Sequence, residues 1–106
     1  MRWCRLTPTL GQLPAPHGTL DYDNPDHTAR SWLRRLFEYG PFTAPFNISG
    51  NPAISLPLAQ STEGLPIGIQ LVAPYGREDL LIRVAAQLEA AVPWWSRVPP
   101  HHVALG

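Results

Sequence analysis

The chain has 106 residues, of which 44% are apolar and 15% charged, so it is long enough for one hydrophobic core and too short for two. Eight arginines balance eight acidic residues, which removes the long-range field that nucleic acid or an anionic membrane surface would need. No apolar stretch approaches the roughly 20 residues of a membrane span, and no signal-type apolar run follows the first residues. We therefore expect a cytoplasmic protein that binds neither nucleic acid nor membrane.

Two absences limit the chemistry that the chain can perform. Cys4 is the single cysteine, so neither an internal disulfide nor a thiolate metal cluster can form within one chain. Lysine does not occur, which excludes any reaction that uses an amine base or a Schiff base of this chain. The 13 prolines and eight glycines, together about a fifth of the residues, predict that much of the backbone lies in turns and loops.

The first predicted elements are a short strand end, an extended loop and a helix. Three prolines between residues 6 and 20 remove backbone donors, so we expect a strand end near residue 6 and then a loop. Apolar residues at helical spacing predict an amphipathic helix over about 28–39, and these are Ala29, Trp32, Leu33, Leu36 and Phe37. Asp26 or Thr28 can cap its start, and Gly40 can end it in the left-handed conformation.

The second half predicts a hairpin and a second helix. Residues 41–52 contain too many prolines and glycines for regular structure and predict a structured loop. Two apolar segments, 53–58 and 65–73, are separated by a polar stretch of hairpin-loop length and predict an antiparallel pair. A helical pattern over about 77–92 has acidic residues in its first turn, where the helix dipole favours them. Residues 94–106 follow as an extended tail.

These elements, two to three strands and two main helices, define an α/β chain. So few strands leave unpaired edges if the chain stands alone. We therefore expect the edges to be covered by the rest of a larger domain or by another copy of this chain, and an oligomer when the chain is isolated.

No pattern of reactive side chains predicts catalysis. The serines lack the Gly-x-Ser-x-Gly pattern of a nucleophile, so hydroxyls bonded to their own loop backbone are the better interpretation. Cys4 lacks a fixed base. The four histidines lack the spacing of a zinc pair, and they are His17, His27, His101 and His102. Three aspartates suggest a calcium loop but lack its glycine and its bidentate glutamate, and they are Asp21, Asp23 and Asp26. We assign no catalytic residue, no metal and no cofactor.

Three phrases taken together carry a family resemblance. Residues 42–57 read FTAPFNISGNPAISLP, residues 64–74 read GLPIGIQLVAP, and residues 78–89 read EDLLIRVAAQLE. In this order they resemble the C-terminal region of the amidase signature family, and the resemblance extends over about residues 6–100. It implies the family's α/β fold, in which helices flank a mixed sheet, with residues 1–106 as a single partial domain.

The resemblance also implies an activity. Family members hydrolyse a carbon–nitrogen amide bond with a serine nucleophile, a second serine held in a cis peptide and a lysine base, all within a Gly/Ser-rich region ahead of the matched phrases. This chain has neither a lysine nor such a region. We therefore expect the C-terminal segment of a bacterial amidase, inactive alone. The alternative is a free-standing, non-catalytic binding or assembly module derived from the amidase fold.

The position near Gly40 bears on the substrate. In family members that hold an amino-acid amide through an acidic residue, that residue aligns near Gly40, and glycine cannot bind an ammonium group. The resemblance therefore favours a simple or aromatic amide over a glutamine-like one.

Residues 42–52 are the candidate for substrate contact, because a loop with rigid turn chemistry here adjoins a strand. Asn47 and Gly50 suit a tight turn. We expect four side chains to form one wall of the substrate pocket, and these are Phe42, Thr43, Phe46 and Asn47. On base rates a core role for each aromatic taken singly is somewhat favoured.

Two further side chains carry expectations about structure. Gln70 lies within an apolar strand, where a buried amide needs partners, so we expect it to bond to a neighbouring loop rather than to substrate. Trp94 and Trp95 follow the second helix, where an aromatic pair more often closes a core edge than stacks on a ligand.

Overall fold

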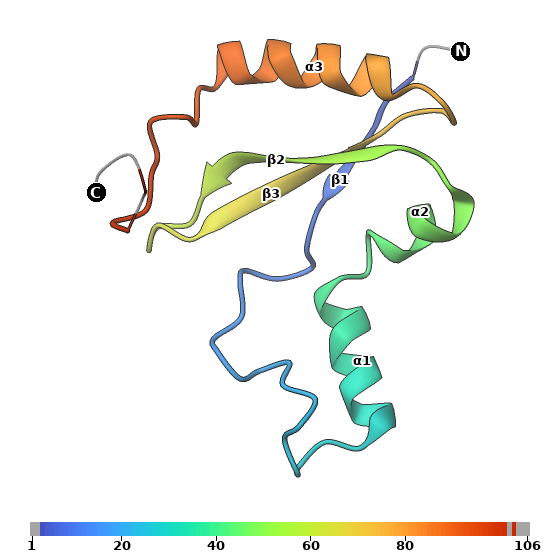
Figure 1. The fold of residues 1–106 in the computed structure, drawn as a ribbon, viewed down its shortest axis with the longest axis vertical. Coiled ribbons are helices and arrows are strands. Elements are labelled where there is room, and N and C mark those ends of the chain that lie inside the picture. The colour runs from blue at the N-terminus through green and yellow to red at the C-terminus, as the bar shows by residue number, and fades with distance from the viewer. Residues whose placement is uncertain (1–2, 102, 104–106) are drawn as a thin grey trace.

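A computed structural model describes residues 3–101 and 103. Its elements in chain order are β1 (Arg5–Pro8), α1 (Ala29–Tyr39), α2 (Ala44–Ser49), β2 (Ala53–Gln60), β3 (Pro66–Val72) and α3 (Glu78–Ala91). The three strands form one antiparallel sheet in the order β1-β3-β2, so β3 is the central strand (Figure 1). The predicted α/β class is confirmed, with a third, short helix in addition to the two main ones.

The predicted hairpin is confirmed as β2 and β3. Ser55 lies opposite Gln70, and the register shifts between Leu56 and Ala59. The shift spans Pro57, which has no N–H to donate to a neighbouring strand. On the other side of β3, Thr7 of the short strand β1 also lies opposite Gln70. Gln70 is therefore flanked by a hydroxyl-bearing residue on each neighbouring strand.

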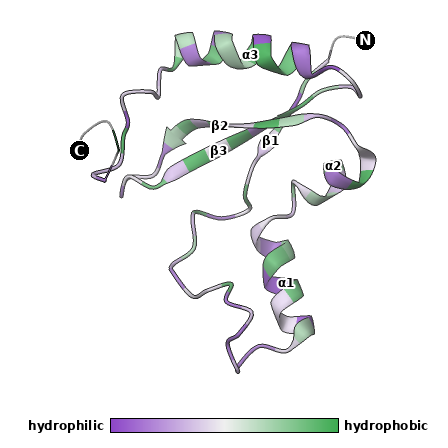
Figure 2. Ribbon diagram, viewed as in Figure 1, coloured by the Kyte–Doolittle hydropathy of each residue, from purple (hydrophilic) through white to green (hydrophobic). Residues whose placement is uncertain are grey.

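One face of the sheet forms the core with α3. The buried cluster comprises Leu56, Leu71, Ala73 and Leu81. The partly buried residues packed against it are Ile54, Leu58, Leu80, Val84, Ala85, Leu88 and Trp94. Figure 2 shows hydrophobic stretches on β2 and β3 and on parts of α3, which lies along one side of the sheet. Because residues of a strand alternate between faces, the residues next to these core positions point to the opposite side of the sheet.

The helix predicted over 77–92 is confirmed as α3, and its first turn holds Glu78 and Asp79. Arg77 Nε donates to Asp79 Oδ1 at 2.8 Å, and Arg83 Nη2 lies 3.6 Å from Asp79 Oδ2. The hydrogen bond from Arg77 is the main reason that the pKa of Asp79 falls to about 2. The start of α3 is therefore stabilised by a carboxylate that stays ionised in mild acid.

The helix predicted over 28–39 is confirmed as α1, and Thr28 rather than Asp26 caps it. Ser31 N donates to Thr28 Oγ1 at 3.1 Å, while Thr28 N donates to Ser31 Oγ at 2.9 Å. The expected left-handed Gly40 is wrong, because its φ is −122°. Pro41 follows directly, and a residue before proline is displaced toward extended φ values.

The prediction of no regular structure over 41–52 is wrong, because α2 occupies Ala44–Ser49. Pro45 lies in the first turn, where a helix does not need the missing N–H. Gly50 ends the helix in the left-handed conformation with φ 75°, and its N–H donates to Phe46 O at 3.0 Å. Asn47 therefore lies inside a helix instead of forming the expected turn.

Helix α1 projects from the sheet on the side away from α3 (Figure 1). None of its residues is buried, and Leu33 and Phe37 are 45% and 56% exposed. Another side of the helix is tied to the loop that precedes it. Trp32 Nε1 donates to Leu20 O at 2.9 Å, and Ala15 N donates to the Tyr39 hydroxyl at 3.0 Å. The amphipathic pattern therefore predicts the helix correctly, but part of its apolar side is uncovered.

The predicted tail begins with a turn instead of an extended segment. Arg97 N donates to Trp94 O at 2.9 Å, and the Arg97 guanidinium donates to Pro57 O. Trp94 packs on the core as expected for an aromatic at a helix end, whereas Trp95 is 71% exposed. Residues 102 and 104–106 of the predicted tail lie outside the described residues. In the part of the chain that the structure describes, no helix has the length and apolar character to span a bilayer.

A pair of neighbouring residues on α3 tests the core. Leu81 is 3% exposed and Ile82 is 65% exposed. Leu81→Ala should lower the free energy of unfolding of the chain by about 2–5 kcal/mol because it leaves a cavity, whereas Ile82→Ala should change it by less than about 1 kcal/mol. Urea denaturation followed by circular dichroism measures both. Equal losses for the two variants would contradict the packing of α3 on the sheet.

The start of α3 predicts a pH dependence. A carboxyl whose pKa is lowered on folding stabilises the fold above its unfolded pKa, and this contribution disappears as the pH falls through the folded value. Compared with Asp79→Asn, the wild-type chain should therefore have the higher melting temperature at about pH 5, and the difference should vanish toward about pH 2. Thermal unfolding across this range measures the difference. A difference that is constant with pH would contradict the role given to the Arg77–Asp79 pair.

Candidate functional site

The four residues predicted to line a pocket lie together at α2. Phe42 and Thr43 come directly before the helix, and Phe46 and Asn47 lie within it. Phe42, Thr43 and Phe46 are half-buried, while Asn47 is exposed. Helix α2 lies on the side of the sheet away from α3 (Figure 1). Neither aromatic belongs to the buried cluster under α3, so the segment is separate from that cluster.

The side-chain amide of Gln70 connects this segment to the sheet. Gln70 is 4% exposed, and its Nε2 donates to Phe42 O at 2.9 Å and to Thr7 Oγ1 at 3.0 Å. Two acceptors satisfy the two hydrogens of the amide nitrogen, as burial of a polar group requires. The prediction that Gln70 bonds to a neighbouring loop is confirmed, and the same atom also holds strand β1.

A second polar contact lies next to Gln70 and was not predicted. Thr9 Oγ1 and Ser55 Oγ are 2.7 Å apart, although 46 positions separate them in the sequence. They meet over Gly68 of the central strand, where an added Cβ would lie 2.8 Å from Thr9 Oγ1 and 3.0 Å from Ser55 Oγ. A glycine between two isoleucines in an otherwise apolar strand was the available signal for such a close approach. We call Thr7, Thr9, Ser55 and Gln70 the polar seam.

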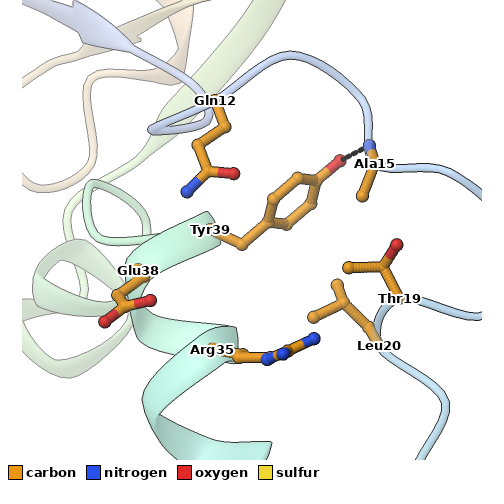
Figure 3. A pocket seen from close by; sticks show the side chains of 7 residues that line it. All are labelled: Gln12, Ala15, Thr19, Leu20, Arg35, Glu38 and Tyr39. Atoms are coloured by element: carbon orange, nitrogen blue, oxygen red, sulfur yellow. Dashed lines mark hydrogen bonds between the residues drawn. The ribbon is translucent and has the colours of Figure 1, made fainter.

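A hollow of about 180 Å³ lies between α1 and the loop before it. Its lining residues are Gln12, Ala15, Thr19, Leu20, Arg35, Glu38 and Tyr39. Figure 3 shows the Tyr39 ring across the hollow, with its hydroxyl bonded to Ala15 N, and Arg35 directed toward Leu20. The lining differs from the predicted pocket wall. It provides one guanidinium and one carboxylate on a partly open surface and no nucleophile beside a base.

The remaining candidates have local structural roles. The Ser31 hydroxyl accepts a hydrogen bond from Thr28 N at 2.9 Å, and the Ser61 hydroxyl accepts one from Leu65 N at 3.1 Å, as expected for serines that bond to loop backbone. Asp21 Oδ1 accepts from Asp23 N at 3.0 Å and so bends its own loop. Cys4 is exposed. Within residues 3–101 and 103, no group of three His, Cys, Asp or Glu side chains could hold a metal, and His102 lies outside these residues.

Comparison with known proteins identifies the class. The family model described as Amidase matches residues 5–82, so the chain belongs to the amidase family. Among curated proteins, the 6-aminohexanoate-cyclic-dimer hydrolase of Pseudomonas sp. strain NK87 is 55% identical over 97 residues, which are 90% of this chain and 18% of that protein. The enzyme of the same name from Paenarthrobacter ureafaciens is 48% identical over 95 residues, with the same two shares.

The fold comparison agrees with the sequence comparison. A solved structure of 6-aminohexanoate cyclic dimer hydrolase superimposes on this chain with a TM-score of 0.81 at 45% identity, and the match covers 92% of this chain and 21% of that one. The chain therefore has the fold of one segment of these hydrolases and spans about a fifth of their length. The resemblance on which the sequence prediction rested is confirmed at the level of the family and the fold.

Proposed function

We propose that the chain is the C-terminal segment of a bacterial, cytoplasmic amidase that hydrolyses carbon–nitrogen amide bonds, with residues 1–106 as a single partial domain. One observation carries the proposal: 90% of the chain matches hydrolases of amide bonds, yet it covers only 18% of their length. The named relatives come from bacteria. The match covers nearly all of this chain but only a small part of each relative. This difference supports a segment of a larger catalytic domain.

In this proposal the catalytic groups come from the part of the amidase that this chain does not match. Attack on an amide requires an activated nucleophile, and a serine hydroxyl needs a base close by. The chain contains no lysine, and Ser55, on the open face of the sheet, contacts the neutral hydroxyl of Thr9. The contribution of the chain is therefore binding. The segment at α2 supplies one wall of the substrate pocket through Phe42, Thr43, Phe46 and Asn47.

The residues of this wall favour an uncharged amide. Two aromatic rings, a hydroxyl and a carboxamide offer apolar contact and neutral hydrogen bonds, and neither Gly40 nor its neighbour Pro41 has a side chain that could bind an ammonium group. The named relatives act on a cyclic dimer of 6-aminohexanoate. We propose that the substrate is a neutral amide with aliphatic character. The cyclic dimer of 6-aminohexanoate is the first such amide to test. Aromatic rings can pack against a chain of methylene groups without any charged partner.

The partner of the chain is the remainder of the amidase domain. The uncovered apolar residues Leu33 and Phe37 lie on the side of the sheet away from α3, as does α2. Exposed apolar side chains on adjacent turns of one helix, as here, are typical of a surface that another part of a protein covers. Because the matched segment makes up only 21% of the solved hydrolase that shares this fold, the remaining part of that hydrolase is a sufficient source of that cover. A second copy of the chain is the competing occupant.

The first prediction concerns the chain alone. The purified chain should hydrolyse the cyclic dimer of 6-aminohexanoate and simple aromatic amides no faster than buffer, because no base activates its serines. Product amine released over time measures the rate, with Ser55→Ala as the matched control. Turnover that the wild-type chain shows and Ser55→Ala lacks would contradict the proposal.

The second prediction concerns the pocket wall in a complete enzyme. The chain replaces the matching segment of the hydrolase from Pseudomonas sp. strain NK87 in a chimera, made feasible by the 55% identity. Because we place Phe46 in the pocket wall, we expect Phe46→Ala to alter the order of preference among amides and to leave the melting temperature within a few degrees. As a core change, it should cost about 3–5 kcal/mol of stability and slow all amides alike.

The control for the Phe46 experiment is Ile82→Ala, which is exposed on α3 and away from α2. This variant should keep both the amide preference and the melting temperature of the chimera. An unchanged preference in Phe46→Ala, together with a large loss of stability, would remove the pocket assignment.

A further inference from the structure

The buried amide of Gln70 forms hydrogen bonds with segments that lie outside the apolar cluster. Gln70 lies on β3 between Ile69 and Leu71, and it is almost fully buried without belonging to the apolar cluster. One hydrogen bond from its Nε2 reaches Thr7 on the edge strand, and the other reaches the backbone carbonyl of Phe42. Burying an amide in a sheet costs free energy unless its hydrogen bonds are made. Here the two bonds hold β1 and the segment before α2 against the central strand.

The bond to Phe42 fixes one end of the α2 segment. At the other end, Asn51 Nδ2 donates to Ala73 O at 3.1 Å, and Ala73 N donates to Pro52 O at 3.1 Å. Both anchoring residues, Gln70 and Ala73, belong to β3 or directly follow it. The segment between them contains the whole proposed pocket wall. It is therefore held to the central strand at two points, and Gln70 provides the one that lies next to Phe42.

We propose that Gln70 is a positioning residue of the substrate pocket, which sets the place of Phe42 and Phe46 by holding the Phe42 carbonyl against the central strand. This inference rests on the proposed function, because it takes α2 as the pocket wall. In this inference Gln70 acts without donating to substrate, because both hydrogens of its amide nitrogen are already bonded to Thr7 and Phe42. Its effect passes through the main chain of Phe42 to the rings that follow.

A positioning role and a purely structural role differ in what they do to kinetics. If Gln70 only stabilises the sheet, its replacement lowers the melting temperature and leaves the binding of substrate by the folded enzyme unchanged. If it positions the wall, the folded enzyme binds substrate less well. The nucleophile and base lie outside this chain, so kcat should change less than KM.

The chimera with the Pseudomonas hydrolase provides the test, with the cyclic dimer of 6-aminohexanoate as substrate. Gln70→Met keeps the length of the side chain and removes both donors, and Gln70→Asn keeps the amide but is too short to reach both partners. Each should raise KM by about tenfold, the size expected when a buried hydrogen bond that places the wall is lost, and should keep kcat within about threefold.

Two variants provide matched controls. Gln87→Met removes an exposed amide from α3 and should leave KM and kcat unchanged. Thr7→Val removes the acceptor on β1 and keeps the bond from Gln70 to Phe42. It should therefore lower the melting temperature and keep KM within about threefold of the parent chimera. A Thr7→Val variant with the same KM as Gln70→Met would contradict the inference, because the strand and not the Phe42 carbonyl would then control binding.

The outcomes separate this inference from the proposed function. A parent chimera that hydrolyses no amide contradicts the proposed function and the inference with it. An active parent whose Gln70 variants melt earlier but keep KM contradicts the inference alone. Loss of folded protein in both Gln70→Met and Gln70→Asn also contradicts it, because the amide would then act on stability only. A raised KM in folded Gln70 variants, with unchanged Gln87→Met, supports it.

Discussion

The pleat of the central strand is the constraint on which the rest of the structure depends. Successive residues of β3 point to opposite faces, so Leu71 packs under α3 while Gln70 meets β1 and the start of α2. A shift of one residue in the pairing would place an amide in the apolar core and a leucine in the polar seam. The register of β3 therefore decides both the position of the core and the position of the candidate pocket wall.

The main elements could be predicted from the sequence because they follow local periodicity. The helical spacing of apolar residues predicts α1 and α3 to within about a residue or two, and the two apolar segments on either side of a polar loop predict the hairpin. Composition alone does not predict helix α2, because proline and glycine break a helix at most positions. Pro45 and Gly50 occupy the two positions, in the first turn and directly after the last residue, where a helix favours them. Whether a proline or glycine breaks a helix therefore depends on its position within the helix as well as on the residue type.

The candidate site could be predicted only in part, because its contacts join distant segments. The need of Gln70 for a partner follows from burial of an amide in an apolar strand, and that expectation was correct. The identity of the partner depends on which backbone carbonyl the fold brings near, which local patterns do not contain. The contact between Thr9 and Ser55 depends in the same way on the register of three strands. The family resemblance predicts the amidase family, and only the structure shows how the residues of the candidate wall are arranged.

Because the short strand β1 is far from the hairpin in the sequence, we expect it to join the sheet late in folding. The hairpin and α3 are contiguous in sequence, so their contacts close short loops, whereas the bond between Gln70 and Thr7 joins residues 63 positions apart. Contacts that close long loops form more slowly, because more chain entropy is lost before they stabilise the fold. We expect residues 53–91 to fold as an early unit onto which β1 docks late. The polar seam is then among the last parts of the sheet to form, and the start of α2 becomes fixed to β3 only as this step ends.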